Sequence, residues 1–256
     1  MDPGGQVLCW GRNDSGQLGD GTTTDRATAA PVAGISDASA VSAGQDHACA
    51  IVGTGSVKCW GENDEGQLGD GTSGNYRTSP VTVPGLTDVV KLAMTWNNTC
   101  ALRAVGEVRC WGFGGVNGDG TYVDRLSPVA VLGLSGGVTD IAGGDAHFCA
   151  IGVGADARCW GNNDEGQARG AVGPWTLTAA VIPGVAGVTG LGIGQKFSCA
   201  LVGGGAVKCW GTNGFGELGD GTGVDSPSAV DVTGVSGATQ VAGGYRQACA
   251  VLGDEL

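Results

Sequence analysis

The tripeptide Cys-Trp-Gly occurs five times in this chain of 256 residues, at a nearly constant interval. Successive copies are separated by 49 to 51 residues and begin at Cys9, Cys59, Cys110, Cys159 and Cys209. Such a period is typical of repeat architectures, in which each copy is one supersecondary unit that packs against its neighbours. We therefore predict one repeat domain over residues 1–256. Its units are expected at about 9–58, 59–109, 110–158, 159–208, and 209–256 together with 1–8.

Each unit consists of short β-branched segments separated by turns. The best preserved turn, Asn-Asp-x-Gly-Gln-Leu-Gly-Asp-Gly-Thr, occupies residues 13–22 and 63–72, and Asn, Asp and Gly supply the left-handed backbone positions that turns require. Segments such as 81–83 and 89–92 have the composition of strands. About four strands per unit, repeated radially, form the blade of a propeller. The sequence therefore predicts an all-β fold, a five-bladed β-propeller.

A second set of cysteines predicts a hairpin in each unit. Four of its members precede the next Cys-Trp-Gly by ten residues, so a hairpin folded about Thr54 would place Cys49 opposite Cys59. Directly opposed residues of antiparallel strands lie about 4.5 to 5.5 Å apart at Cα, within the span of a disulfide. The pairs expected from this register are Cys49–Cys59, Cys100–Cys110, Cys149–Cys159 and Cys199–Cys209.

Cys9 and Cys249 remain, one at each end of the chain. Cys9 holds the position of the later hairpin strand and Cys249 that of the earlier one, so together they would complete a fifth hairpin. We expect the first strand to pair with the last, with a Cys9–Cys249 bond fixing the closed ring. This placement favours a complete small ring over a fragment of a larger propeller. Metal or redox roles for the cysteines fit less well, because a ten-residue spacing does not resemble a Cys-x-x-Cys knuckle.

The repeat resembles that of the RCC1 family (regulator of chromosome condensation). The stretch Ala-Gly-Gln-Asp-His-Ala-Cys-Ala-Ile at 43–51, followed at 57–69 by Val-Lys-Cys-Trp-Gly-Glu-Asn-Asp-Glu-Gly-Gln-Leu-Gly, matches the family pattern, and the match recurs five times. The resemblance implies a propeller that binds another protein across one rim. By this resemblance the chain is identified as a small, cysteine-rich, bacterial-type member. Some bacterial members of the family bind and inhibit a secreted enzyme in this way. Familiar members have seven blades and lack the paired cysteines.

The tryptophans of the tripeptides are expected to pack between neighbouring blades: Trp10, Trp60, Trp111, Trp160 and Trp210. The resemblance also raises light sensing, because one plant member absorbs ultraviolet light through clustered tryptophans at another repeat position. We assign that position here to His47, Trp96, His147, Lys196 and Tyr245. Since it holds one tryptophan, photoreception is not expected.

Loops that abandon the consensus are candidates for a specific binding edge. The third unit is shortened at 111–121, and the fourth replaces its turn at 168–175. Relaxed selective constraint on these loops would equally explain their departure from the consensus. The candidate binding edge comprises Phe113, Tyr122, Trp175, Trp96 and Tyr245.

Charge argues against nucleic acid as a partner. With 13 Lys plus Arg against 25 Asp plus Glu, the net charge of −12 would repel phosphate backbones. A basic partner protein and simple solubility are both compatible with this acidity. The sequence contains no apolar run of about 18 residues, so no membrane-spanning helix is predicted. Because the cysteines favour an oxidising compartment, we expect a secreted or surface protein whose export signal is not part of this sequence.

Few residues in the sequence are candidates for catalysis. His47 and His147 occupy equivalent repeat positions, and neither Gly-x-Ser-x-Gly nor a phosphate loop is present. The Asp-rich turns lack an EF-hand pattern, so turn formation is the expected role of Asp14, Asp20, Asp64, Asp70, Asp119 and Asp220. We predict a monomeric, non-enzymatic binding or structural scaffold without catalytic residues, metal or cofactor. Two alternatives stay open: a calcium- or carbohydrate-binding lectin-like propeller, and an inert spacer domain of a larger surface protein.

Overall fold

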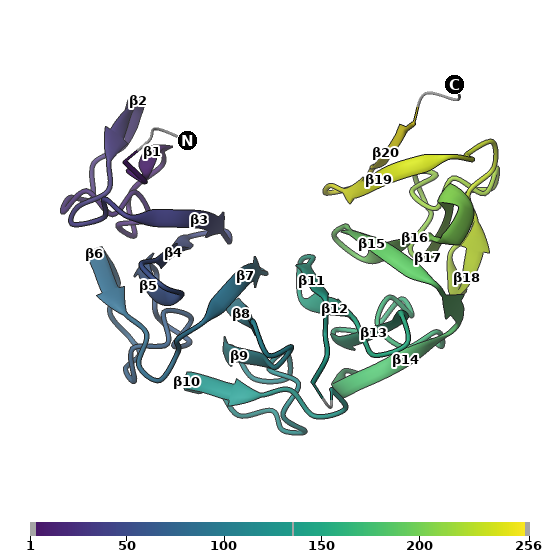
Figure 1. Cartoon of the computed structure of the whole chain (residues 1–256), viewed down its shortest axis with the longest axis horizontal. Coiled ribbons are helices and arrows are strands. Elements are labelled where there is room, and N and C mark those ends of the chain that lie inside the picture. Colours follow the sequence, from purple (N-terminus) through teal and green to yellow (C-terminus); the bar gives the residue numbers. More distant parts are fainter. Residues whose placement is uncertain (1–3, 135, 254–256) are drawn as a thin grey trace. The chain divides into compact units, whose positions relative to one another are not determined.

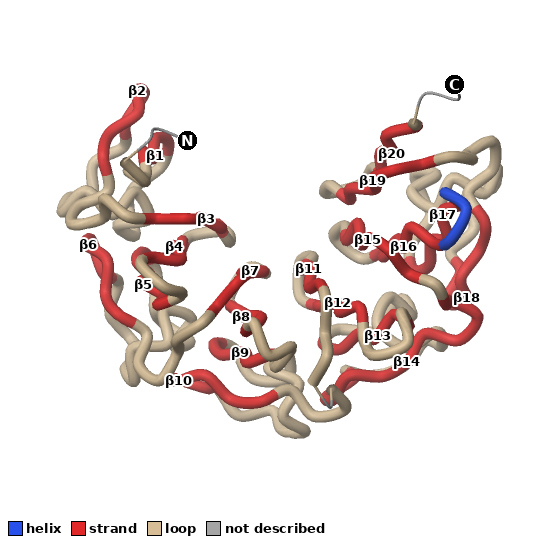
Figure 2. The backbone as a smooth tube through the Cα atoms, viewed as in Figure 1, coloured by secondary structure: helices blue, strands red, loops and turns tan. Residues whose placement is uncertain are grey.

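The computed structural model describes residues 4–134 and 136–253, which consist of short strands joined by turns and loops (Figures 1 and 2). The elements are β1 Leu8–Gly11, β2 Arg26–Pro31, β3 Ala38–Ala43, β4 His47–Val52, β5 Ser56–Gly61, β6 Arg77–Thr82, β7 Val89–Met94, β8 Asn98–Arg103, β9 Val108–Gly112, β10 Arg125–Ala130, β11 Asp140–Gly143, β12 His147–Ile151, β13 Asp156–Gly161, β14 Thr176–Ala186, β15 Val188–Ile193, β16 Phe197–Val202, the 3₁₀ turn η1 Gly203–Gly205, β17 Ala206–Gly211, β18 Ser226–Asp231, β19 Ala238–Gly243 and β20 Ala248–Leu252.

The chain divides into two compact units. The first comprises Met1–Asn117 with Tyr122–Ala130, and the second comprises Gly118–Thr121 with Val131–Leu256. The first unit contains the two-stranded sheet β1–β2 and the four-stranded antiparallel sheets β3–β6 and β7–β10. The second contains the four-stranded sheets β11–β14 and β15–β18 and the two-stranded sheet β19–β20. Four strands per blade is thus correct for the four complete sheets, whereas the count of five blades and ring closure stay predictions.

The sequence repeat and the sheet are offset from one another. Four of the five Cys-Trp-Gly tripeptides lie at the end of the third strand of a four-stranded sheet, in β5, β9, β13 and β17. A repeat counted from this tripeptide therefore begins in one sheet and ends in the next. By the same correspondence β1 and β2 match the third and fourth strands of a sheet, and β19 and β20 match the first and second.

Four of the five predicted disulfides are present, each between the second and third strand of a sheet. The strand registers oppose the paired cysteines directly, and their Cα atoms are 4.0 or 4.1 Å apart. These bonds indicate an oxidising compartment. Cys9 and Cys249 carry free thiols. They belong to different units, since β1 pairs with β2 and β20 with β19, and the fifth bond therefore stays a prediction.

The apolar core lies between successive sheets of each unit. Trp60 packs with Val32 and Ile35, and Trp111 packs with Val83 and Leu86. Trp60, Trp111, Trp160 and Trp210 are fully buried at 0% exposure. Trp10 departs from the expected packing and is 64% exposed, because no sheet precedes β1–β2 in its unit. In the stretches 4–134 and 136–253, no helix is long and apolar enough to cross a membrane.

Candidate functional site

The seam between neighbouring sheets is held by a repeated hydrogen bond from tryptophan. In each case the indole N–H donates to the main-chain carbonyl of a glutamine in the turn of the preceding sheet, at 2.9 to 3.0 Å. The pairs are Trp60 with Gln17, Trp111 with Gln67, and Trp210 with Gln167. The preserved turn therefore supplies a specific acceptor to the next sheet as well as reversing the chain.

His47 belongs to this seam. Its Nε2 lies 2.9 Å from Oγ1 of Thr99 in the next sheet, and Thr99 Oγ1 lies 3.0 Å from the Gln67 carbonyl. A hydroxyl has one proton, and a carbonyl can only accept. Thr99 therefore donates to Gln67, and Nε2 of His47 carries the proton that it donates to Thr99. The Gln67 oxygen also accepts the Trp111 indole, so one carbonyl joins three side chains.

His147 makes the same arrangement in the second unit. Its Nε2 lies 2.9 Å from Ser198 Oγ, which donates to the Gln167 carbonyl at 3.1 Å. Burial lowers the pKa of His47 to about 4 and that of His147 to about 3. Both rings are neutral hydrogen-bond donors in the seam, and this geometry gives them a structural role.

The repeat position assigned from the sequence to His47, Trp96, His147, Lys196 and Tyr245 is wrong. His47 and His147 are opposite Gly61 and Gly161, and the residues opposite the matching glycines of the other sheets are Asn98 and Phe197. Trp96, Lys196 and Tyr245 lie instead in the turns before β8, β16 and β20. His47 and His147 precede their cysteines by two residues, whereas Trp96, Lys196 and Tyr245 precede theirs by three or four and so fall outside the strand.

Three of the five candidate binding-edge residues lie at one end of sheet β7–β10. Trp96 is in the β7–β8 turn, and Phe113 and Tyr122 are in the β9–β10 loop; they are 48%, 38% and 62% exposed. The Phe113 amide donates to the Asn97 carbonyl at 3.1 Å, which ties the loop to the turn. We call these three side chains the aromatic rim. Trp175, half-buried before β14, and Tyr245, exposed before β20, belong to the second unit.

Carboxylates crowd the loops next to the aromatic rim. Burial and the adjacent Asp124 carboxylate raise the pKa of Glu65, and burial and Asp46 raise the pKa of Glu62. Asp124 itself accepts the Gly114 amide at 2.7 Å, at the start of the aromatic loop. Sequence reasoning missed this cluster, because Glu65 and Asp124 come from different sheets. Repulsion between the carboxylates adds to burial in raising these pKa values, so the loops beside the aromatic rim are locally acidic.

The aspartates of the preserved turns organise those turns. Asp20 accepts the Thr22 amide at 2.9 Å and the Thr22 hydroxyl at 2.7 Å, and it pairs with Arg26. Burial opposes ionisation, but these hydrogen bonds outweigh it and lower the pKa of Asp20 to about 2. Asp220 and Thr222 repeat the pattern. Within the described stretches, no three His, Cys, Asp or Glu residues are grouped as metal ligands.

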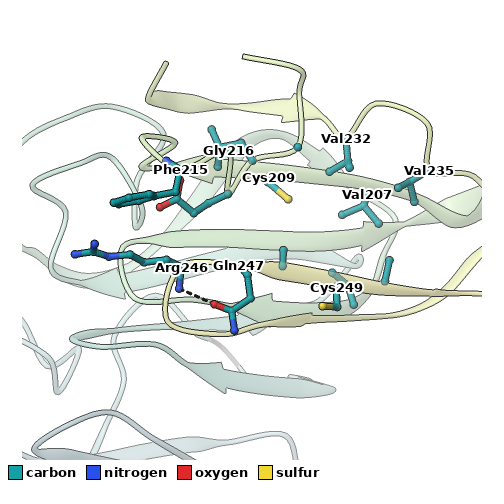
Figure 3. Close-up of a pocket in the computed structure, with 15 residues that line it drawn as sticks. Val207, Cys209, Phe215, Gly216, Val232, Val235, Arg246, Gln247 and Cys249 are labelled. Carbon is teal, nitrogen blue, oxygen red and sulfur yellow. Dashed lines mark hydrogen bonds between the residues drawn. The ribbon is translucent and has the colours of Figure 1, made fainter. Parts of the chain in front are cut away.

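A cleft in the second unit separates the loop after β17 from strand β20 (Figure 3). Its volume is about 230 Å³, and its walls include Leu218, Gly219, Val232 and Cys249. At one end, shown in Figure 3, the Arg246 guanidinium lies 4.7 Å from the ring centroid of Phe215, a cation–π distance. The free Cys249 thiol therefore belongs to a partly apolar groove.

A second cleft lies in the first unit, beside strand β1. Its volume is about 470 Å³, and its walls include Leu8, Cys9 and Trp10 together with residues 43–48. Burial raises the pKa of the Cys9 thiol. Each free cysteine thus lines a cleft within its own unit.

Comparison with known proteins gives matches along the chain. A model of the regulator of chromosome condensation (RCC1) repeat matches residues 4–51 and 54–102, and a second RCC1 repeat model matches 38–67 and 138–167. Together they cover just over half of the chain. The human E3 ubiquitin-protein ligase HERC2 is 31% identical over 172 residues, which are 64% of this chain and 4% of HERC2.

Two solved structures share the fold. Human WBSCR16 superposes with a TM-score of 0.83 at 23% identity, covering 99% of this chain and 68% of that one. The yeast RCC1 protein Prp20, crystallised with Kap60, gives a TM-score of 0.81 at 23% identity, covering 98% of this chain and 65% of that one. The chain thus spans about two thirds of these solved chains and a small part of HERC2.

Proposed function

The chain belongs to the RCC1 repeat family, and on that basis we propose that it is a protein-binding propeller scaffold that binds its partner across the loop rim of the first unit. The family is in general a non-catalytic scaffold, which agrees with buried, neutral histidines that hold sheets together. The observation that carries the proposal is the aromatic rim, where Trp96, Phe113 and Tyr122 are exposed at one end of a four-stranded sheet.

The surroundings of the aromatic rim define the chemistry of the partner. Exposed aromatic rings contribute large contact areas at protein interfaces and attract cations to their faces. Glu62 and Glu65 lie beside them in a cluster of mutually repelling carboxylates. A protein surface that presents arginine or lysine side chains among apolar groups fits both features. The net charge of −12 would speed the encounter with such a partner.

We place the protein outside the cell or on its surface and propose a monomeric five-bladed ring. The four disulfides support an oxidising compartment. The two-stranded sheets support the fifth blade, since β19–β20 corresponds to the first two strands of a blade and β1–β2 to the last two.

Substitution of the aromatic rim tests the binding proposal. The immobilised full chain should capture a protein from the exported proteins of its source, with chemical cross-links to residues 96–124. Trp96→Ser with Tyr122→Ser should abolish this capture. Val105→Ser, at a 66% exposed position in the turn at the other end of the same sheet, should retain it.

Two results would overturn the binding proposal. One is capture no greater than that of a blank support. The other is equal capture by the double variant and the Val105→Ser control, with both shown to be folded by circular dichroism.

A further inference from the structure

A smaller cleft of the second unit adjoins the one in Figure 3 and shares Phe215 and Arg246 with it. Its volume is about 180 Å³. Three turns supply its walls: residues 195–196 before β16, the loop 212–225 after β17, and residues 245–246 before β20. We call it the arginine cleft. All of its walls belong to the second unit, so its geometry is defined within that unit.

Main-chain hydrogen bonds connect the three turns. The Gln195 amide donates to the Tyr245 carbonyl at 3.3 Å, and the Thr212 amide donates to the Lys196 carbonyl at 3.0 Å. Each turn is therefore bonded to a neighbouring one. A surface that is formed before its partner arrives loses less conformational entropy on binding.

Two aromatic rings hold the side chain of Arg246. The guanidinium carbon lies 4.7 Å from the ring centroid of Phe215 and 5.2 Å from that of Tyr245, and both are cation–π distances. Figure 3 shows the side chain extending past the Phe215 ring. Phe215 is 71% exposed and Tyr245 is 58% exposed, so the stacked group lies at the surface. A stacked guanidinium uses its faces against the rings and keeps its N–H groups for an acceptor in its own plane.

The other charged groups of the cleft have partners within the chain. Lys196 pairs with Glu165 at 3.3 Å. Glu217 and Asp225 accept main-chain amides at 2.8 Å and 2.6 Å. Over the part of the chain that the structure describes, no carboxylate pairs with the Arg246 guanidinium. Its N–H donors are therefore available to a group from another molecule.

We propose that the arginine cleft binds a carboxylate of a partner protein, supplied by an aspartate or glutamate next to an apolar residue. The guanidinium of Arg246 donates to both carboxylate oxygens, which is the geometry that its planar fork favours. The exposed rings of Phe215 and Tyr245 contact the apolar neighbour. This surface is separate from the aromatic rim, and its occupant is acidic where the occupant of the aromatic rim is basic.

The charge of the cleft favours a carboxylate over a phosphate. Glu217 and Asp225 lie in its walls together with Lys196 and Arg246, so negative and positive groups are balanced there. A phosphate group on a protein carries about 1.5 to 2 negative charges at neutral pH. The net charge of −12 of the whole chain also opposes a strongly anionic partner. The occupant therefore carries few negative charges.

Nuclear magnetic resonance of the isotope-labelled full chain tests the arginine cleft. The probe is the blocked peptide acetyl-Gly-Glu-Leu-Glu-Gly-amide, and the control peptide has glutamine in place of both glutamates. The probe should shift the Nε–H signal of Arg246 until the site is saturated, whereas the control peptide should not. Arg246→Gln should weaken binding of the probe about tenfold or more, because it removes a charged hydrogen-bond donor.

Two further variants separate the charge of Arg246 from its placement. Phe215→Ala keeps the charge but removes one stacking ring, and it should weaken binding of the probe about threefold. Arg169→Gln is the matched control, because it removes an exposed arginine that does not line the cleft, and it should bind the probe like the wild type. All three substitutions are at exposed positions, and circular dichroism checks that each variant is folded.

Four outcomes would overturn the arginine cleft. The first is no shift of the Arg246 signal at millimolar probe, and the second is equal binding of the probe and its glutamine control. The third is equal binding of the probe by the wild type and Arg246→Gln. The fourth is tighter binding of the same peptide with phosphoserine in place of both glutamates, which would assign the cleft to phosphate. None of these readouts involves Trp96 or Tyr122, so the aromatic rim is tested separately.

Discussion

At the scale of single residues, the seam at Gln67 is a short chain of hydrogen bonds that ends on one main-chain carbonyl. His47 donates to Thr99, Thr99 donates to Gln67, and Trp111 donates to the same carbonyl. The repeated histidine position predicted a structural role. The partner could not be predicted from the sequence, because Thr99 lies 52 residues away and contacts His47 only when two sheets pack.

Replacing both buried histidines should remove an acid-sensitive part of stability. Their native pKa values of about 4 and about 3 lie below the unfolded value of about 6.5, so the unfolded chain binds protons first. The contribution of the two histidines to the free energy of unfolding is fully present above about pH 6.5. It falls as the pH is lowered toward 4, by about 3 kcal/mol for His47. The variant with His47→Gln and His147→Gln should lose much less free energy of unfolding over the same pH range.

Denaturant unfolding at about pH 7 and about pH 4.5 measures this difference. Glutamine is a suitable replacement, because Gln247 precedes Cys249 by two residues as His47 precedes Cys49. Glu62 and Glu65, whose raised pKa values act in the opposite direction, are common to both proteins and cancel in the comparison. An equal loss in the wild type and the double variant would show that the histidines do not carry the acid sensitivity.

At the scale of the element, the hairpins could be predicted to the residue. The ten-residue spacing and the glycines around Thr54 fix a register in which Ile51 faces Val57 and Cys49 faces Cys59, as observed. The residues of the aromatic rim could be named from the sequence, Phe113 and Tyr122 because their loop departs from the consensus, but their assembly at one end of a sheet could not be predicted. Strand connectivity brings Trp96, Phe113 and Tyr122 to one end of a sheet, whereas Trp175 and Tyr245 lie on other elements.

Removing one hairpin disulfide should cost stability without changing the fold. Cys49→Ala with Cys59→Ala opens a ring of about eleven residues, for which chain entropy predicts a loss of about 2 to 3 kcal/mol in the free energy of unfolding, reduced by whatever the hairpin already restricts. Alanine avoids placing a hydroxyl where both cysteines are fully buried. Denaturant unfolding at neutral pH measures the loss. The corresponding change at Cys100 and Cys110 is the matched comparison, and no loss in either variant would contradict the prediction.

At the scale of the whole molecule, the repeat predicted the sheet architecture and the family, while closure depends on both ends of the chain. Four sheets are complete in sequence, because all four of their strands follow one another along the chain. The fifth would draw β19 and β20 from the end and β1 and β2 from the start. No single unit contains this set, so register equivalence, Cys9, Cys249 and the exposed Trp10 are what support it.

Mass spectrometry of the intact chain, with free thiols alkylated before and after reduction, tests the closed five-bladed ring most directly. The account predicts no alkylation before reduction, a monomer mass, and a peptide map that joins Cys9 to Cys249 beside the four hairpin bonds. Alkylation of Cys9 and Cys249 in the oxidised protein, or a bond between these residues in two different chains, would contradict it.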